Sequence, residues 1–191
     1  MSETKPKGKP TKMGVLRIVE MPSGVTATLH ANTLTVKGPQ GEVSKLFKLG
    51  DLSMKLEGNK FTVEAQRATR NNKKFAGSIN AHVNNMVRGS QNNHEYKLKI
   101  CSGHFPMNVA ITSGKLVVKN FHGEKVPRTL ALKQGADVKV EGDHINISSA
   151  SKEIAGQVAA DIEQLTRRPG FDTRIFQDGI YIIMKDGKDL K

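Results

Sequence analysis

Basic side chains are the groups in this sequence whose types and spacing suit a definite chemistry, and that chemistry is phosphate binding. Arg167, Arg168 and Arg174 flank a Pro-Gly turn near the C-terminus. A guanidinium group can donate two parallel hydrogen bonds to phosphate oxygens, so closely spaced arginines are typical of phosphate-binding surfaces. Cations at the end of a predicted helix also stabilise the helix dipole, which leaves a purely structural interpretation open.

Two further basic groups lie in the first half of the chain. One is in the N-terminal segment and the other surrounds the start of a predicted helix: Lys5, Lys7, Lys9 and Lys12, and Arg67, Arg70, Lys73 and Lys74. Each group can neutralise phosphates, and a solvated tail and a solvated helix face are the alternatives. Residues 1–90 hold 15 basic and 6 acidic residues, against 15 and 12 in residues 91–191. Most of the positive excess is therefore in the first half.

No pattern in the sequence indicates catalysis or metal binding. The six histidines have no metal-ligand spacing, and no G-x-S-x-G or similar nucleophile motif occurs. Gly38-Pro-Gln-Gly41 matches the G-x-x-G loop of KH domains, but that loop joins two helices and this one joins two predicted strands. Trp is absent and aromatic residues make up 5% of the chain, so base-stacking surfaces are poorly supplied. We expect no enzyme and no cofactor, and recognition of backbone and shape.

Composition favours nucleic acid as the partner. The net charge is +12 and the isoelectric point about 9.9, which predicts attraction to a polyanion. The longest apolar run, Ile180 to Met184, is far shorter than the roughly 18 residues that a membrane span needs. Met1 to Lys12 lacks the apolar core of a secretory signal, and the single cysteine, Cys101, excludes an internal disulfide and predicts a small buried residue. We expect a cytoplasmic protein with no membrane and no small-molecule substrate.

An internal repeat organises the chain. Leu34-Thr-Val-Lys-Gly-Pro-Gln-Gly41 aligns with Leu116-Val-Val-Lys-Asn-Phe-His-Gly123, and Met54-Lys-Leu-Glu-Gly58-Asn-Lys-Phe-Thr-Val63 aligns with Val138-Lys-Val-Glu-Gly142-Asp-His-Ile-Asn-Ile147. In the second pair, apolar residues alternate on both sides of a Gly-polar turn. This pattern predicts one β-hairpin in each half.

A helix is predicted after each hairpin. The apolar residues follow helical spacing in both copies: Phe75, Ile79, Val83 and Met86, and Ile154, Val158, Ile162 and Leu165. The small pairs Ala76-Gly77 and Ala155-Gly156 suit a close approach between helix and sheet. Thr69 and either Ser149 or Ser151 are the candidate N-caps, and Arg88-Gly89 and Arg168-Pro169-Gly170 are the predicted stop signals.

One more strand is predicted after each helix, over Tyr96 to Cys101 and over Thr173 to Gln177. Asp178-Gly179 then suits a tight turn into a last strand, Ile180 to Met184. The prediction is an α+β protein of two tandem duplicated domains, residues 15–101 and 102–184, each a small antiparallel sheet with one helix on one face. Residues 1–14 are predicted to form a mobile tail and residues 185–191 a frayed end.

Several motifs resemble one family. They are Gln164-Leu-Thr-Arg-Arg, Arg174-Ile-Phe-Gln-Asp-Gly-Ile-Tyr181-Ile, Val36-Lys-Gly-Pro-Gln-Gly41, His104-Phe-Pro-Met107 and Asn120-Phe-His-Gly-Glu-Lys125. Together they resemble the L six family of large-subunit ribosomal proteins, called L nine in eukaryotic naming, in its archaeal and eukaryotic branch. The resemblance covers essentially the whole chain. The Phe176-Gln-Asp-Gly form is closer to archaeal members, and Ser102-Gly103 departs from a bulkier family pattern, which predicts a more flexible link there.

The resemblance implies a structural ribosomal protein that binds large-subunit rRNA near the sarcin-ricin loop and supports the region where translation factors dock. Neighbouring ribosomal proteins would be further partners. It also implies that the second domain makes most rRNA contacts, through Arg167, Arg168, Arg174, the Asp178-Gly179 turn and Lys185. The charge distribution instead favours the first half. The two indications agree if the second domain binds RNA through a few well-placed contacts while the first domain attracts RNA diffusely through its charge.

Two other classes of function remain open at this point. A tandem protein-interaction module would pair a partner chain with the exposed edges of its two sheets, and its binding would depend weakly on salt. An enzyme would need a cleft with converging titratable groups, of which the sequence shows none.

Overall fold

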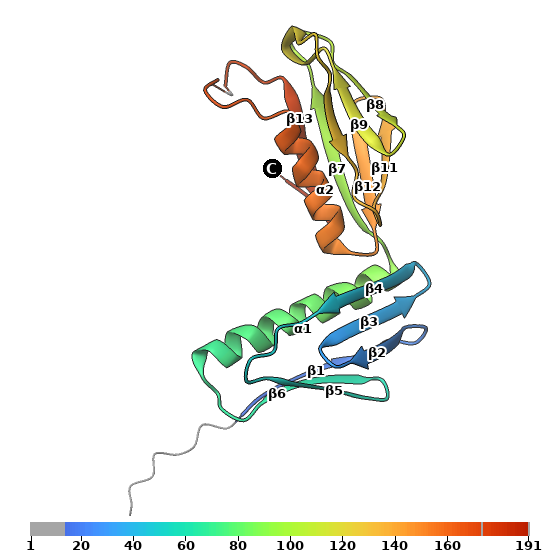
Figure 1. Cartoon of the computed structure of the whole chain (residues 1–191), viewed down its shortest axis with the longest axis vertical. Helices are drawn as coiled ribbons and strands as arrows, with labels where there is room; N and C mark the ends of the chain where they lie inside the picture. The colour runs from blue at the N-terminus through green and yellow to red at the C-terminus, as the bar shows by residue number, and fades with distance from the viewer. Residues whose placement is uncertain (1–13, 173, 191) are drawn as a thin grey trace, which may run out of the picture. The chain divides into compact units, whose positions relative to one another are not determined.

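The computed structural model describes residues 14–172 and 174–190, and the chain divides into two compact units between Arg88 and Gly89 (Figure 1). The predicted tail and its four lysines therefore lie outside the described residues, apart from residue 14. The first unit contains six strands and most of one long helix: β1 (Val15–Glu20), β2 (Thr26–His30), β3 (Thr33–Gly38), β4 (Gly41–Leu46), β5 (Ser53–Glu57), β6 (Lys60–Ala65) and α1 (Arg70–Gln91). Its described strands form two antiparallel sheets, with the orders β1-β6-β5 and β2-β3-β4.

The second unit has the same α+β character, which confirms the predicted class. Its elements are β7 (His94–Cys101), β8 (Asn108–Thr112), β9 (Lys115–Lys119), a 3₁₀ turn (Phe121–Gly123), β10 (Arg128–Ala131), β11 (Asp137–Glu141), β12 (His144–Ser149), α2 (Lys152–Leu165), β13 (Gly179–Lys185) and β14 (Lys188–Asp189). The strand orders are β11-β12-β7-β13-β14 and β10-β9-β8. Each unit thus contains two small sheets and not the single sheet predicted.

The hairpins form where the repeat predicts them. Glu57 pairs with Lys60, and Glu141 pairs with His144, so each loop has two residues. The first loop residue is a glycine with positive φ, 57° at Gly58 and 59° at Gly142, a conformation that costs other residues free energy. Gly38-Pro-Gln-Gly41 is likewise a two-residue hairpin turn, between β3 and β4, and not a KH loop.

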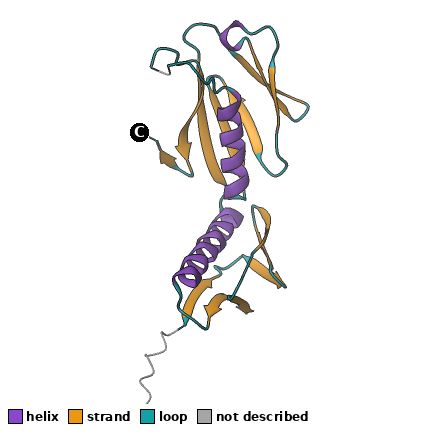
Figure 2. Ribbon diagram, turned by 60° about the vertical axis from the view of Figure 1, so that its left-hand side comes forward, coloured by secondary structure: helices purple, strands orange, loops and turns teal. Residues whose placement is uncertain are grey.

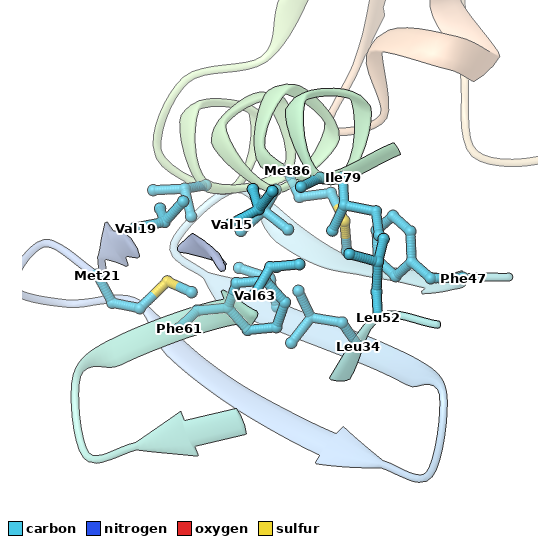
Figure 3. Close-up of a cluster of buried hydrophobic side chains, with 14 of the residues drawn as sticks. Val15, Val19, Met21, Leu34, Phe47, Leu52, Phe61, Val63, Ile79 and Met86 are labelled. Atoms are coloured by element: carbon cyan, nitrogen blue, oxygen red, sulfur yellow. The ribbon is translucent and has the colours of Figure 1, made fainter. Parts of the chain in front are cut away.

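The core of the first unit lies between α1 and the strands (Figure 3). Its fully or nearly fully buried side chains include Val15, Val19, Leu34, Val36, Phe61, Val63, Ala76, Ile79, Val83 and Met86. The buried stripe of α1 begins at Ala76, one residue after the Phe75 that was predicted to begin it. Phe75 is 51% exposed, and the neighbouring Ala76 is fully buried. Gly77 has open space at its Cβ position, so the predicted close approach there is wrong.

The two ends of α1 differ in how well they were predicted. Thr69 is the N-cap, because its hydroxyl accepts a hydrogen bond of 3.1 Å from the Asn72 amide. At the other end the helix does not stop at Arg88-Gly89 but continues to Gln91. Gly89 already belongs to the second unit, and a Cβ atom on it would collide with the Ala150 carbonyl of the same unit. This glycine therefore permits close packing and does not end the helix.

Strand β7 corrects the predicted domain boundary. It lies at the centre of the five-stranded sheet, between β12 and β13, so residues 94–101 belong to the second unit (Figure 1). Figure 2 shows the strands of both units in orange. The pairing repeats that of β1, since Val15 pairs with Ala65 of β6 and His94 pairs with Ser149 of β12. Each copy of the repeat thus begins with this strand, whereas the prediction placed it at the end of the first copy.

Helix α2 packs on β7, β12 and β13 and contacts β10. Ser151 is its N-cap, whereas Ser149 donates its hydroxyl to the Gly135 carbonyl at 2.6 Å. Gly156 allows the close approach predicted for it, because a Cβ atom there would lie 3.2 Å from the Tyr96 hydroxyl. The buried core of this unit includes Leu98, Leu116, Phe121, Ile145, Ile147, Val158, Ile162 and Ile180.

The segment between α2 and β13 differs from the prediction. Residues 174–178 form a turn and irregular structure, and not a strand. The Asp172 carbonyl accepts from the amides of Ile175 and Phe176, and the Asp172 side chain accepts from the Arg174 amide at 2.9 Å. These bonds use the groups that a strand would offer to its neighbour. Asp178-Gly179 is therefore no hairpin turn: Gly179 begins β13 and pairs with Cys101.

The C-terminal end is ordered up to residue 190, and not frayed as predicted. Lys185 pairs with Lys188 across a tight turn, and the Leu190 amide donates to the Ile183 carbonyl at 2.8 Å. Among the described residues, no helix is long and apolar enough to cross a membrane. The same residues contain no group of three or more His, Cys, Asp or Glu side chains that could hold a metal ion.

Candidate nucleic-acid interface

Three arginines lie on the surface of the second unit, in the residues that follow α2. Arg167 and Arg168 are exposed directly after the helix. Arg174 is 88% exposed, and its guanidinium donates to the Asp172 carboxylate, with Nη2 2.7 Å from Oδ2. This hydrogen bond and the one from the Arg174 amide lower the pKa of Asp172. An ion pair in full solvent contributes little to stability, so the guanidinium can leave Asp172 for a phosphate.

Aromatic rings gather beside these arginines. Phe171 and Phe176 meet edge to face, with ring centroids 5.0 Å apart. The His122 ring lies 6.2 Å from Phe171 and 6.3 Å from Phe176. The Arg168 guanidinium carbon lies 4.1 Å from the centroid of Phe171, which is a cation–π contact.

The rings of His122, Phe171 and Phe176 and two of the arginines, Arg167 and Arg168, line one pocket of about 760 Å³. Its walls come from the end of α2, the segment after it, the 3₁₀ turn and β13: His122, Glu163, Gln164, Thr166, Arg167, Arg168, Pro169, Gly170, Phe171, Phe176, Asp178 and Tyr181. Two bonds hold α2 and β13 together beneath it. The Ile180 amide donates to the Thr166 hydroxyl at 2.9 Å, and the Ile182 amide donates to Glu163 Oε1 at 3.1 Å.

Arg128 anchors the end of α2. It donates to both carboxylate oxygens of Glu124, at 2.8 and 2.6 Å, and to the Leu165 carbonyl at 2.7 Å. Its guanidinium also lies 4.4 Å from the centroid of Phe121. The hydrogen bonds from Arg128 lower the pKa of Glu124. Arg128 therefore satisfies a carbonyl at the helix C-terminus, a role that the sequence offered to Arg167 and Arg168.

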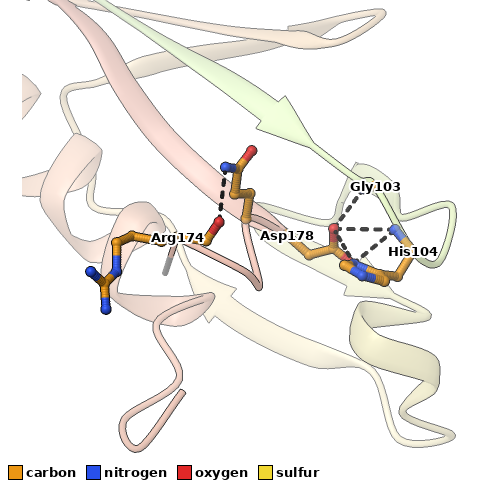
Figure 4. Close-up of polar contacts among 5 residues, drawn as sticks. Gly103, His104, Arg174 and Asp178 are labelled. Carbon is orange, nitrogen blue, oxygen red and sulfur yellow. Dashed lines mark hydrogen bonds and ion pairs between the residues drawn. The ribbon is translucent and has the colours of Figure 1, made fainter. Parts of the chain in front are cut away.

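Asp178 fixes the segment that carries Arg174 (Figure 4). Its side chain is only 1% exposed, and Oδ1 accepts from the Gly103 amide at 2.5 Å and from the His104 amide at 3.3 Å. The His104 Nδ1 atom lies 3.4 Å from the same oxygen. Burial raises the pKa of this carboxyl, but the hydrogen bonds from Gly103 and His104 outweigh burial and lower it. The predicted flexible link at Ser102-Gly103 is thus tied to Asp178.

A second, partly buried carboxylate holds the turn after β13, next to Lys185. Asp186 lies 2.6 Å from His94 Nδ1 and 2.7 Å from Lys152 Nζ, and its amide donates to the Glu95 carbonyl. Burial raises the pKa of Asp186, but the hydrogen bonds from Lys152 and His94 outweigh it, so the pKa is lowered. Lys185 itself is exposed.

Comparison with known proteins identifies the family. The sequence pattern of the family described as Ribosomal protein L6 matches residues 21–92 and 105–179, once in each unit. The chain belongs to this family. The whole segment after α2, up to Gly179, falls within the second match.

The L6 relatives include archaeal proteins that match along nearly their whole length. The large ribosomal subunit protein uL6 of Methanothrix thermoacetophila is 38% identical over 171 residues, which cover 90% of this chain and 97% of that protein. The uL6 of Methanococcus vannielii is 38% identical, covering 90% and 94%, and that of Methanobrevibacter smithii is 39% identical, covering 88% and 94%. The predicted family and its archaeal branch are therefore confirmed.

Membership of the L6 family settles the class of function. The protein is a structural constituent of the large ribosomal subunit and not an enzyme, and as a ribosomal protein it works in the cytoplasm. Two tandem matches to one pattern also agree with the internal duplication.

The other predicted basic group of this L6-family chain lies in the first unit, around the start of α1. Arg67, Arg70, Lys73 and Lys74 are all exposed. Three of them fall in the first turns of the helix, where no acidic residue balances them. The positive end of the helix dipole is already there, so these cations repel it and one another. A bound polyanion would relieve this repulsion.

Reasoning from the sequence missed the aromatic side chains of the pocket. The low aromatic content predicted no stacking surface, but content alone does not show where the few aromatic rings gather in the fold. Phe121 and His122 lie about 50 residues before Phe171 and Phe176, and only the fold brings them together. A signal was available in the motif Asn120-Phe-His-Gly-Glu-Lys125, which marks the 3₁₀ turn and not a regular strand.

Proposed function

We propose that this protein binds large-subunit rRNA near the sarcin-ricin loop through the surface at the end of α2, and that it thereby supports the region where translation factors dock. The proposed rRNA contacts are Arg167, Arg168 and Arg174, with Lys185 at the far end of β13. The observation that carries this proposal is the grouping of three exposed arginines in the segment around one aromatic pocket, with Arg167 and Arg168 in its wall and Arg174 close in sequence to Phe176.

Geometry supports a defined site on the second unit. The end of α2 is bonded to β13 through Thr166, and the Arg174 segment is held by the buried Asp178. A surface fixed in this way loses little conformational entropy when RNA binds. Asp178 and Gly179, both buried, would position this surface and not contact RNA themselves.

The first unit would contribute diffuse attraction. Its basic group at the start of α1 and the four lysines of residues 5–12 would neutralise phosphates without fixing the register. Such contacts supply affinity that falls steeply with salt, whereas placed contacts decide where the protein sits. This division reconciles the charge excess of the first half with a binding site in the second.

The test is binding of the full chain to an rRNA fragment that carries the sarcin-ricin region, with a scrambled RNA of equal length, over a salt series. We expect a preference for the real fragment that persists at high salt. Changing Arg167, Arg168 and Arg174 together to Ala should remove most of this preference. Equal binding to both RNAs, with a log–log slope of about −0.7 to −0.9 per neutralised phosphate, would contradict a placed site.

Two control variants remove the same charge elsewhere. Lys97 and Lys139 lie exposed on the sheet face opposite α2 and Lys115 is exposed in β9. None of the three lines the pocket, so changing them to Ala tests the second unit away from the site. Changing Lys5, Lys7 and Lys9 to Ala tests the tail. Because each control removes phosphate contacts, it should lower the affinity for the two RNAs equally and reduce the salt slope. The preference for the real fragment over the scrambled RNA should stay intact. A loss of preference equal to that of the arginine variant would favour diffuse electrostatics.

One observation favours an additional role in protein contacts. Among the described residues, no strand pairs with the outer edge of β1, whose outward side chains include the exposed Leu16 and Ile18. In the second unit the corresponding edge of β7 is covered by β13. A neighbouring ribosomal protein could add a strand there. Such binding would survive high salt, and Ile18→Pro, which removes an N–H on the unpaired side of β1, would weaken it without changing affinity for RNA.

A further inference from the structure

We propose that the pocket at the end of α2 receives one unpaired nucleobase of the bound RNA. This inference deepens the proposed function and rests on it: the arginines would hold the backbone, and the pocket would hold a base that is turned out of the helix. The ligand class is a single-stranded or bulged nucleotide, recognised by stacking and by the edge of its base.

Aromatic residues are scarce in this chain but concentrated at this site. The sequence has seven Phe, two Tyr and no Trp. Three of these nine, Phe171, Phe176 and Tyr181, line the pocket, together with the His122 ring. Phe171 is 39% exposed, so part of its ring is open to an incoming group. Stacking on aromatic side chains is the common way in which proteins hold unpaired bases.

The size and the charge of the pocket fit a nucleotide. Its volume of about 760 Å³ lies in the range of roughly 300–1,000 Å³ that is typical of small-ligand pockets. Arg168 covers one face of Phe171, and a guanidinium plane is itself a surface on which bases stack. Arg167 stands beside it at the rim. A base inside the pocket would thus place its own phosphate close to two cations.

One polar side chain of the pocket suits recognition of a base edge. Gln164 is exposed and lines the pocket, and among the described residues no group bonds to its side-chain amide. An amide offers both a donor and an acceptor, which is the pattern that pairs with the edge of adenine. Glu163 is not available in the same way, because its carboxylate accepts from the Ile182 amide.

The experiment is a double-mutant cycle between the protein and the rRNA fragment that carries the sarcin-ricin region. In the RNA, the base of each unpaired nucleotide is removed in turn, which leaves every phosphate in place. In the protein, Phe171 is changed to Ala, with Phe105→Ala as the matched control. Phe105 belongs to the same unit and is 46% exposed, but it does not line the pocket. Tyrosine fluorescence and circular dichroism establish that both variants are folded.

We expect Phe171→Ala to weaken binding about 5- to 150-fold, which corresponds to the ~1–3 kcal/mol that stacking of one base contributes. The salt slope should not change, because no phosphate contact is lost. Removal of the base at one position should weaken wild-type binding similarly and should have no further effect on Phe171→Ala. Phe105→Ala should behave like the wild type. Gln164→Ala should weaken binding most when the base at that position is adenine.

The outcomes separate this inference from the function on which it rests. If the wild type prefers the real fragment but no base removal couples to Phe171, the pocket holds no base, while the proposed rRNA site stands. If Phe171→Ala and Phe105→Ala weaken binding equally, the inference is also overturned. If the wild type shows no preference for the fragment over scrambled RNA, the proposed function itself fails.

Discussion

Replacing Asp178 should destabilise the second unit and detach the segment that carries Arg174. The carboxylate accepts hydrogen bonds from the amides of Gly103 and His104 and is 1% exposed. In Asp178→Ala, both amides lose their acceptor. In Asp178→Asn the side-chain shape is kept, but the charge is lost and an NH₂ group replaces the oxygen that faces the His104 amide. Ala should therefore be worse than Asn.

The magnitude follows from these bonds. A buried donor left without an acceptor costs about 1–3 kcal/mol. Gly103 and His104 themselves are exposed, so water can reach part of the vacated site, and the loss for two amides should be about 2–3 kcal/mol. For Asn we expect about 1 kcal/mol. With a urea dependence of ~1.5 kcal/mol per molar for a domain of this size, Asp178→Ala should lower the urea midpoint by about 1–2 M.

The effect should also depend on pH, in a direction set by the lowered pKa of Asp178. A carboxyl whose pKa is lower in the folded state stabilises the fold fully above its unfolded value, which is about 3.9. That contribution is lost as the pH falls through the folded pKa. The difference in unfolding free energy between the wild type and Asp178→Ala should therefore be largest at neutral pH and shrink below pH ~4.

The chain provides its own probe for this measurement. It has no Trp, and its two tyrosines, Tyr96 and Tyr181, both lie in the second unit. Tyrosine fluorescence in urea thus follows the second unit, while circular dichroism follows both. The reasoning is refuted if Asp178→Ala and the wild type share one midpoint at pH 7. It is also refuted if their difference persists undiminished in acid.

Two further predictions test how the helices are held. Gly77→Ala should stabilise the first unit by up to ~1 kcal/mol because its Cβ position is open, whereas Gly89→Ala should cost the protein about 2 kcal/mol or more because its Cβ would meet backbone. Thermal unfolding by circular dichroism compares the two, and a gain at Gly89 would contradict the packing described. Arg128→Lys should cost the second unit ~1–2 kcal/mol in urea, since an ammonium cannot bond Glu124 through two atoms and the Leu165 carbonyl together. An unchanged urea midpoint would show that this arginine does not hold the helix end.

Local patterns predicted the elements that local physics determines. The hairpins at Gly58 and Gly142 were recognisable because alternating apolar residues and a turn glycine are encoded within ten residues of sequence. The helices followed from apolar spacing, although the exposed Phe75 shows that hydrophobicity alone does not locate the buried stripe. At Gly89 the sequence showed a small residue near a helix end, and only the close approach of the Ala150 carbonyl shows why it is small.

Long-range pairing explains the predictions that were wrong. Strand β7 follows α1 directly, so the sequence around it could not show whether it joins the sheet before it or the one after it. A strand was predicted over Thr173 to Gln177 because one strand was expected after each helix, but bonds to Asp172 form a turn at residues 174–176. The anchoring roles of Arg128 and Asp178 were invisible for the same reason, because their partners lie 37 and about 75 residues away.

The position of the proposed site follows from how the two copies of the repeat diverged. In the first copy the chain passes from α1 into the next unit within a few residues, whereas in the second copy it passes from α2 through residues 166–178 into β13. Neither that segment nor β13 has a counterpart among the strands of the first unit that the structure describes, over residues 14–88. The arginines, the pocket aromatics Phe171 and Phe176, and the buried Asp178 all lie in this addition. The net charge of each half of the chain could not reveal such a site. The added segment contributes few charges, and its effect is to hold them at fixed positions.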